Sequence, residues 1–580
     1  MRTISGKHPV AVRVAFVAVF VAALAACGGS KEDTAVPETP PTASEAARFL
    51  TQATFGPTDA DVDHVVAVGY SAWIDEQFAK PAVSHRAFWD TQEAATKAAD
   101  STKTIGQDGV FNSFWKQAVS GDDQLRQRVA YALSQIMVIS LQDGTVGENP
   151  RAVADYLDML GDKGLGNYRE LIESVSRHPM MGIYLSSIRN RKADPRTGRV
   201  PDENYAREVM QLFTIGLHQL NDDGSEQTAN GAPIDTYGPS DIAGMAKVFT
   251  GFSWACPDWP DNSCFNSGSL NTVSYPNYTF MPMVGYPQYH STEEKVFLGT
   301  TIAAQTTSNP DASLKTALDT LYNHPNVGPF IGKQLIQRLV TSNPSPAYVA
   351  AVAQTFANNG SGVRGDMKAV IKRILTHPEA RVVSTTSGKV REPILRVSAV
   401  LRSFGYASDS GWYRMGNTDN AASSLGQTAM RSPSVFNFYR PGYVAPGTQA
   451  AAAGLVAPEM ALAQETSAAG YVNYLRDAIS GGFGASATVT VNGASVTRRD
   501  LQPNFNAELA LADQPAALVD RLNARLMYGG MPDALKTEIV TAISTIALSG
   551  TQTQIDTAKR TRVNAAVFLT AVSPEYQVQK

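Results

Sequence analysis

The stretch PDENYAREVMQLFTIGLHQLN, residues 201–221, brings together side chains that could act on or bind a ligand. Glu203 or Glu208 could serve as a general acid or base if burial or a neighbour moved its pKa toward neutrality. Arg207 could hold a carboxylate, phosphate or sulfate through two parallel hydrogen bonds. His218 could donate or accept a proton or bind a metal. With Asn204, which is spaced to pair with Glu208, these residues are the candidate catalytic or binding residues.

The spacing of this stretch predicts one amphipathic helix. At about 100° per residue, the apolar side chains from Tyr205 to Leu217 share one arc. The polar side chains lie opposite or at the edge of that arc: Glu203, Asn204, Arg207, Glu208, Gln211, Thr214 and His218. Glu203 and Glu208 diverge by about 140°, so they cannot form a two-carboxylate pair unaided. The polar face is either an ordinary solvated face or the wall of a cleft beneath residues 253–295.

A second polar cluster lies in YHSTEEKVFLG, residues 289–299. His290 and Glu293 are weak candidates for metal ligands, and an exposed turn leading into a strand is the alternative. His178, His324 and His377 each precede a proline, a pattern that indicates a helix-ending junction and a structural role. The sequence contains no HExxH, GxSxG or P-loop motif, and we predict no cofactor.

The three cysteines divide into a pair and a single residue. Cys256 and Cys264 flank PDWPDNS, and a local disulfide is predicted because an exported protein folds under oxidising conditions; a two-cysteine metal site is the alternative. Cys27 ends LAAC, which is similar to a bacterial lipobox, and is the predicted lipidation site. An uncleaved anchor, or a plain secretory signal with an incidental cysteine, is the alternative.

The N-terminal residues predict export. A basic beginning precedes VAFVAVFVAALAA, an apolar run too short for a comfortable membrane span, so residues 1–26 are interpreted as a lipoprotein signal peptide. Residues 27–43 are rich in Pro, Thr and acidic side chains, which predicts a flexible tether. A lipidated Cys27 would hold the protein to a membrane. By resemblance to enterobacterial sorting, the absence of Asp after Cys27 favours the outer membrane over the inner membrane.

The rest of the chain is mainly α by its periodicity. A single large helical domain is expected over residues 44–580, with a long irregular insertion at about 253–295. Alternating Val and Thr around Asn492-Gly493 predict a small β-hairpin at about 487–497. The 580 residues carry a formal net charge of −4, which argues against a nucleic-acid partner.

Several motifs together resemble the bacterial "domain of unknown function 1800" family. They occur in the family's order: AARFLTQATFGPT, NSFWKQAVSGDDQLRQRVAYALSQIMVIS, ENYAREVMQLFTIGLHQL, DIAGMAKVFTGFSW, HSTEEKVFLG and SLGQTAMRSPSVFNFYRPGY. The resemblance implies an exported, mostly helical protein, often encoded beside a second exported protein similar to sulfatases and alkaline phosphatases. It implies no reaction.

Two functions are therefore compatible with the sequence. The first is a lipid-anchored binding or assembly protein of the cell envelope that works with a co-exported, sulfatase-like partner. The second is an envelope hydrolase that acts on an extracellular polymer through the polar face from Glu203 to His218. Reaction, ligand and oligomeric state cannot be read from the sequence.

Overall fold

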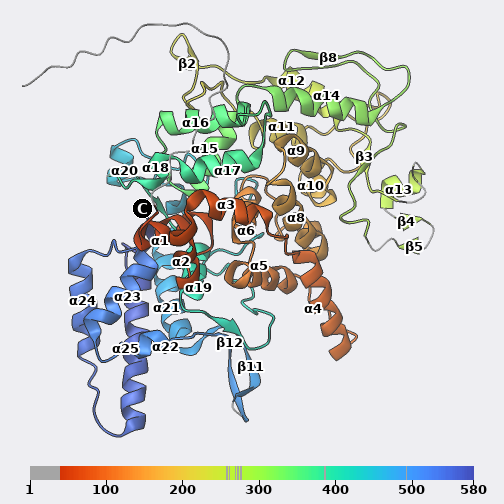
Figure 1. Cartoon of the computed structure of the whole chain (residues 1–580). Coiled ribbons are helices and arrows are strands. Elements are labelled where there is room, and N and C mark those ends of the chain that lie inside the picture. Colours follow the sequence, from red (N-terminus) through yellow and green to blue (C-terminus); the bar gives the residue numbers. More distant parts are fainter. Residues whose placement is uncertain are drawn as a thin grey trace, which may run out of the picture. The chain divides into compact units, whose positions relative to one another are not determined.

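The computed structural model describes residues 40–580, apart from residues 257, 258, 260, 268, 271, 272, 275, 276, 385, 386 and 492. Its elements are mainly α-helices with short antiparallel strands, which confirms the predicted fold class (Figure 1). The signal peptide, Cys27 and nearly all of the tether lie outside the described residues. Within the described part of the chain, no helix is both long enough and apolar enough to cross a membrane.

The first described helix begins at Ala43, where Thr42 and Glu45 form a capping box. The helices of the first half of the described chain are α1 (Ala43–Ala53), α2 (Asp59–Val68), α3 (Tyr70–Ala79), α4 (His85–Ala99), α5 (Asp108–Ser120), α6 (Gln124–Ser134), α7 (Gly144–Gly147), α8 (Pro150–Lys163), α9 (Tyr168–Arg177), α10 (Pro179–Tyr184), α11 (Asn204–Gln211), α12 (Pro239–Val248) and α13 (Asn262–Ser267).

The second half continues the helical pattern after the irregular insertion. Its helices are α14 (Pro310–Asn323), α15 (Val327–Leu339), α16 (Pro346–Ala357), α17 (Met367–Thr376), α18 (Pro378–Arg381), α19 (Pro393–Ser403), α20 (Gln449–Ala452), the 3-10 helix η1 (Pro458–Leu462), α21 (Glu465–Gly481), α22 (Asn506–Leu509), α23 (Pro515–Met527), α24 (Asp533–Ser544) and α25 (Gln552–Val572).

The strands form small antiparallel pairs, with one larger sheet. The pairs are β1 (Thr228–Ala229) with β2 (Ala232–Pro233), β3 (Phe252–Ser253) with β6 (Val284–Gly285), β4 (Ser269–Leu270) with β5 (Val273–Ser274), β7 (Lys295–Phe297) with β8 (Thr300–Ile302), and β9 (Lys389–Val390) with β13 (Val578–Gln579). The predicted hairpin is confirmed and is longer than expected: β11 (Phe483–Val491) pairs with β12 (Ala494–Gln502), which also pairs with β10 (Ala407–Ser408).

The helices bury two large apolar clusters. The first cluster draws on α1 to α18, and the second combines α5 with α19 and the C-terminal helices. In Figure 1 the C-terminal helices α21 to α25 are the blue group. Helix α23 contacts both α1 and α19, so the last helices pack against the beginning of the domain.

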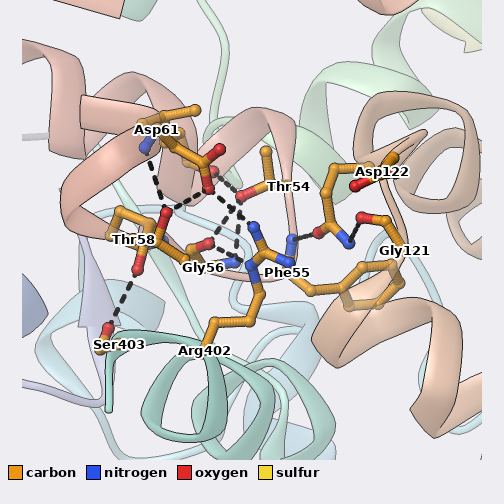
Figure 2. Close-up of polar contacts among 12 residues, drawn as sticks. Thr54, Phe55, Gly56, Thr58, Asp61, Gly121, Asp122, Arg402 and Ser403 are labelled. Atoms are coloured by element: carbon orange, nitrogen blue, oxygen red, sulfur yellow. Dashed lines mark hydrogen bonds and ion pairs between the residues drawn. The ribbon is translucent and has the colours of Figure 1, made fainter. Parts of the chain in front are cut away.

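The loop between α1 and α2 follows Ala53 of the first cluster and contains Phe55 of the second. Figure 2 shows the polar contacts of this loop. Phe55 is buried in the second cluster, and its backbone N–H donates to Gln124. Buried Arg402 of α19 donates to the Gly56 carbonyl at 2.6 Å and pairs with Asp61 at 2.8 Å. The TFGPT motif is therefore a packing feature that joins α1 and α2 to α19.

The insertion at 253–295 is irregular, as predicted, with short strand pairs and the helix α13. Cys256 and Cys264 form the predicted disulfide, with their Cα atoms 6.0 Å apart. The disulfide packs with Phe265 and Tyr286 in a small third apolar cluster. The insertion contacts the end of α9, where the Met283 N–H donates to the Arg177 carbonyl at 2.6 Å.

Candidate functional site

Helix α11 is shorter than the sequence analysis predicted. It ends at Gln211, and the next residues turn so that Ile215 and Gly216 both donate to the Met210 carbonyl. Gly216 has φ +71°, a left-handed conformation that favours glycine, and a side chain there would meet the ring of Phe330. The prediction of one helix through residue 221 was therefore wrong beyond Gln211.

The early helix end changes which side chains are buried. Thr214, predicted on the polar face, is fully buried and donates to the Val209 carbonyl at 2.5 Å. Leu217, predicted on the apolar face, is 51% exposed. A strict rotation of 100° per residue fails here because the backbone leaves the helix before these residues.

The predicted site residues of α11 fall into two environments. Glu203 and Arg207 pair with each other at 3.3 Å, and their side chains are 47% and 45% exposed. Asn204 is exposed beside them. Glu208 is instead 8% exposed, its Oε2 has no hydrogen-bond partner in the described chain, and burial raises its pKa. The structure thus separates Glu208 from the exposed pair.

His218 lies in the loop after α11, where its Nδ1 is 2.8 Å from Glu226. His218 does not lie with His290 and Glu293, the weak candidates for metal ligands; each of these three side chains has different partners. His290 is fully buried, with Nδ1 at 2.8 Å from the Thr250 carbonyl and Nε2 at 3.0 Å from Ser313 Oγ. Glu293 pairs with Lys247 at 2.8 Å. Among the residues that the structure describes, no three His, Cys, Asp or Glu side chains gather as a metal site.

The three His-Pro motifs share one local role. In each, the histidine Nδ1 accepts the backbone N–H two residues later, at 3.1–3.2 Å. His178 and His377 cap the starts of α10 and α18 in this way, and His324 ends α14. These contacts support the structural interpretation of His178, His324 and His377.

A cleft of about 980 Å³ lies beside the end of α11. Its walls come from residues 211–226, from α15, and from the segments 435–442 and 454–456. Of the predicted polar face, Gln211 and His218 line it. A cleft beneath the insertion at 253–295 was one of the two alternatives for this face, and the described residues of that insertion contribute no lining residue here. The volume falls within the range of ligand-binding pockets.

Three cations line this cleft without an ion-pair partner in the described part of the chain: Lys333, Arg338 and Arg440. Lys333 and Arg440 are exposed, and the Arg440 guanidinium stacks 4.1 Å from the ring centre of Phe436. Arg338 is 3% exposed and its Nε has no hydrogen-bond partner among the described residues. Burial lowers the pKa of Arg338. The only acidic side chain in the described lining is Glu226, which pairs with His218.

Two buried glutamines add further free hydrogen-bonding groups at the cleft. The Gln334 Nε2 and the Gln135 Oε1 have no partner among the described residues. Buried polar atoms are nearly always hydrogen-bonded in folded proteins. Together with the Arg338 Nε, the two glutamine atoms make three buried polar atoms that line one cleft without a partner among the described residues. They therefore indicate a site that a polar ligand or ordered water completes.

A buried charge network holds the floor of the cleft in place. The Arg338 carbonyl accepts from Arg128 at 2.7 Å and from Lys389 at 2.8 Å, and Lys389 pairs with Glu459 at 2.9 Å. Glu392 accepts from Gln135 at 2.6 Å. The buried ionisable members are the cations Arg128, Arg338 and Lys389 and the carboxylates Glu392 and Glu459. The network therefore has one more cation than carboxylates.

The sequence analysis did not identify α15 as part of a site. KQLIQRL carries Gln334, Gln337 and Arg338 within an otherwise apolar helix, and all three are buried. Amides and a guanidinium at helical spacing inside a core helix were the available signal. The sequence analysis used the segment SVFNFYRPG only as part of a motif that resembles the family. In the structure, Val435, Phe436 and Arg440 of this segment line the cleft.

Comparison with known proteins identifies a family and no relative of known activity. No curated protein matches the chain, and no solved structure matches it. A family profile described as "Protein of unknown function (DUF1800)" matches residues 48–578, nearly the whole described chain. The chain therefore belongs to the DUF1800 family.

Proposed function

We propose that this protein is an exported, lipid-anchored binding protein of the cell envelope whose cleft beside α15 holds an acidic segment of a co-exported partner. The observation that carries the proposal is the cleft of about 980 Å³ with three cations that have no ion-pair partner in the described chain. An acidic group would supply the counter-charge that Lys333, Arg338 and Arg440 lack.

The lining also suits a chain segment rather than a bare ion. Apolar side chains line the walls together with the cations, among them Phe330, Leu217 and Val456. Arginine and aromatic side chains, here Arg440 stacked on Phe436, are enriched among the residues that contribute most to binding at interfaces. The sulfatase-like protein that the family resemblance implies is the first partner to test.

The export part of the proposal rests on the N-terminal sequence. A basic beginning, an apolar run and LAAC before Cys27 support lipidation there, and a disulfide between Cys256 and Cys264 suits an oxidising compartment. Labelling with a radioactive fatty acid should mark the wild-type protein and leave Cys27→Ala unlabelled. Equal labelling of both proteins would contradict lipidation at Cys27.

Charge reversal at the rim of the cleft tests the binding function. Lys333→Glu with Arg440→Glu should weaken capture of the partner from the native envelope at least about tenfold, because two exposed attractions become repulsions. The control is Arg196→Glu, since the Arg196 side chain is 92% exposed in another loop. Captured proteins are identified by mass spectrometry. Equal recovery of the same partner by all three proteins would contradict the proposal.

One observation favours a hydrolase as the second candidate function. Glu208 is a buried carboxyl with a raised pKa and a free Oε2, as a general acid requires. If the protein cleaves an envelope polymer, Glu208→Gln should abolish release of soluble fragments, whereas Glu203→Gln, at the exposed pair, should leave release unchanged. Release that survives in Glu208→Gln would remove this candidate.

A further inference from the structure

A second cavity, of about 660 Å³, lies where α1, the end of α23 and the strand β13 meet. Three arginines line it: Arg48 from α1, Arg381 from the end of α18, and Arg391 just after β9. None of the three forms an ion pair with a carboxylate side chain in the described part of the chain. Arg48 is 6% exposed and Arg391 is 2% exposed.

The arginines are held in place but not saturated. The Arg48 guanidinium donates to the Arg381 carbonyl at 2.6 Å and to the main-chain oxygen of Lys580 at 2.7 Å. The Arg391 guanidinium lies 4.7 Å from the ring centre of Tyr576. The Nε atoms of Arg381 and Arg391 are buried and have no hydrogen-bond partner among the described residues.

The side chains that line this cavity carry more positive than negative charge. Its charged side chains are Arg48, Arg381, Arg391 and Lys580 against Glu45 and Glu575. The Glu45 carboxylate is already used, since it accepts from the Thr42 backbone N–H and hydroxyl at 2.8 Å. Burial, followed by the nearby charge of Arg48, lowers the pKa of Arg381 to about 10. An anion in the cavity would relieve this crowding of positive charge.

We propose that this cavity is a second binding site, which takes the phosphate group of a larger and partly apolar molecule. Guanidinium groups match the geometry of phosphate oxygens and remain charged at neutral pH. The cavity is much larger than a single phosphate, and Val383, Met527 and Val578 give it apolar walls. The molecule therefore carries the phosphate on a body with apolar surface.

The phosphate could belong to a membrane lipid or to a soluble ester. Ser44 at the edge of the cavity follows Cys27 by 17 residues, a stretch that spans at most about 60 Å. A lipid headgroup is thus within reach of the cavity if Cys27 is lipidated. Only the membrane-lipid source of the phosphate rests on the lipid anchoring proposed above. The phosphate chemistry of the cavity does not depend on it.

The test is calorimetry on the full-length protein in detergent with three probes: phenyl phosphate, dihexanoyl phosphatidylglycerol and dihexanoyl glycerol. Both phosphate probes should bind, and the lipid without phosphate should bind at least about tenfold more weakly. Tighter binding of the phospholipid identifies a membrane source, and tighter binding of phenyl phosphate identifies a soluble ester with an apolar body. Failure of both phosphate probes to bind, or equal binding of the two lipids, would overturn the proposal.

Variants at the mouth of the cavity connect the binding to this site. Val383 is 52% exposed, so Val383→Glu and Val383→Gln should both fold. Val383→Glu should weaken the phosphate probes about tenfold by repulsion, whereas Val383→Gln should not. Arg391→Gln should also weaken them if the variant folds. Val496→Glu on the distant β12 is the matched control, because Val496 is also exposed. Equal affinity in Val383→Glu and the wild type would place the binding elsewhere.

Discussion

Gly56 lies where the loop after α1 crosses α19 without room for a side chain. Its φ is +137°, and a Cβ atom would lie 2.5 Å from the Cα of Ala399. Both features favour glycine, because other residues strain in this conformation and would push the loop from α19. Arg402 also depends on this position, since it donates to the Gly56 carbonyl (Figure 2).

Gly56→Ala should therefore lower the free energy of unfolding by about 3 kcal/mol or more, the sum of backbone strain and a steric clash. Urea denaturation followed by circular dichroism measures this change. Gly144→Ala is the control, because nothing lies within 4 Å of a Cβ added at Gly144. Similar stability of the two variants would show that the loop relaxes without cost.

His290 predicts a pH dependence of stability. Burial lowers its pKa to about 4 from the ordinary 6.5, so the folded protein keeps it neutral where the unfolded chain binds a proton. The contribution of neutral His290 to the free energy of unfolding is fully present above about pH 6.5 and is lost as the pH falls toward 4. Between pH 7 and 4.5 this residue should reduce the free energy of unfolding by roughly 2–3 kcal/mol.

Urea denaturation of the wild type and His290→Gln at several pH values measures that contribution. The difference between the two proteins should be constant above pH 7 and shrink as the pH falls. A difference that stays constant down to pH 4.5 would mean that His290 titrates alike in the folded and unfolded chains.

At the scale of elements, the disulfide acts on the insertion, including its helix α13, rather than on the helices outside the insertion. Cys256 and Cys264 are eight residues apart and pack in the small cluster with Phe265 and Tyr286, separate from the two large apolar clusters. A loop of this length gains about 2.5 kcal/mol from a disulfide in the chain-entropy account.

Cys256→Ser with Cys264→Ser should therefore loosen the insertion, α13 included, while the helices outside the insertion stay folded. Hydrogen–deuterium exchange should rise in residues 253–289 and remain unchanged in α14 to α19. Dithiothreitol added to the wild type should give the same pattern. Faster exchange throughout the helices would show that the insertion supports the whole domain.

At the scale of the whole molecule, the buried charge network connects distant parts of the chain. Lys389 and Glu459 are 0% and 1% exposed, and Lys389 also donates to the carbonyl of Arg338 at the cleft. Burial raises the pKa of Glu459, while Lys389 acts in the opposite direction. Loss of the lysine would leave a buried carboxyl without its partner.

Lys389→Met should lower the free energy of unfolding by about 3–5 kcal/mol. Adding Glu459→Gln should restore part of that stability, because the carboxylate is then gone. Urea denaturation of the single and double variants measures both effects. Arg476→Met, at an exposed pair with Asp477, is the control and should change stability by less than about 1 kcal/mol. A double variant less stable than Lys389→Met would contradict this account.

The sequence by itself determined the features that depend on neighbours along the chain. Helical periodicity indicated the fold class, and alternating Val and Thr around Asn492-Gly493 indicated the hairpin. The pairing of Cys256 with Cys264 was likewise predicted, from two nearby cysteines in a protein expected to be exported. Each of these signals acts over a few residues, so it survives without knowledge of the tertiary contacts.

Only the tertiary structure decided the end of α11 and the cleft beside it. The helix ends at Gln211, and in the turn after it Gly216 meets Phe330, which is more than 100 residues away along the chain; periodicity contains no record of that contact. In the sequence, Arg338 is one polar residue among apolar neighbours. In the structure it donates to the Gln135 carbonyl and lines the cleft together with the 435–442 segment. Burial arises from surfaces distant in sequence. For that reason periodicity placed Glu203 and Arg207 on the polar face of the helix, whereas the burial of Thr214 and the exposure of Leu217 could not be predicted from it.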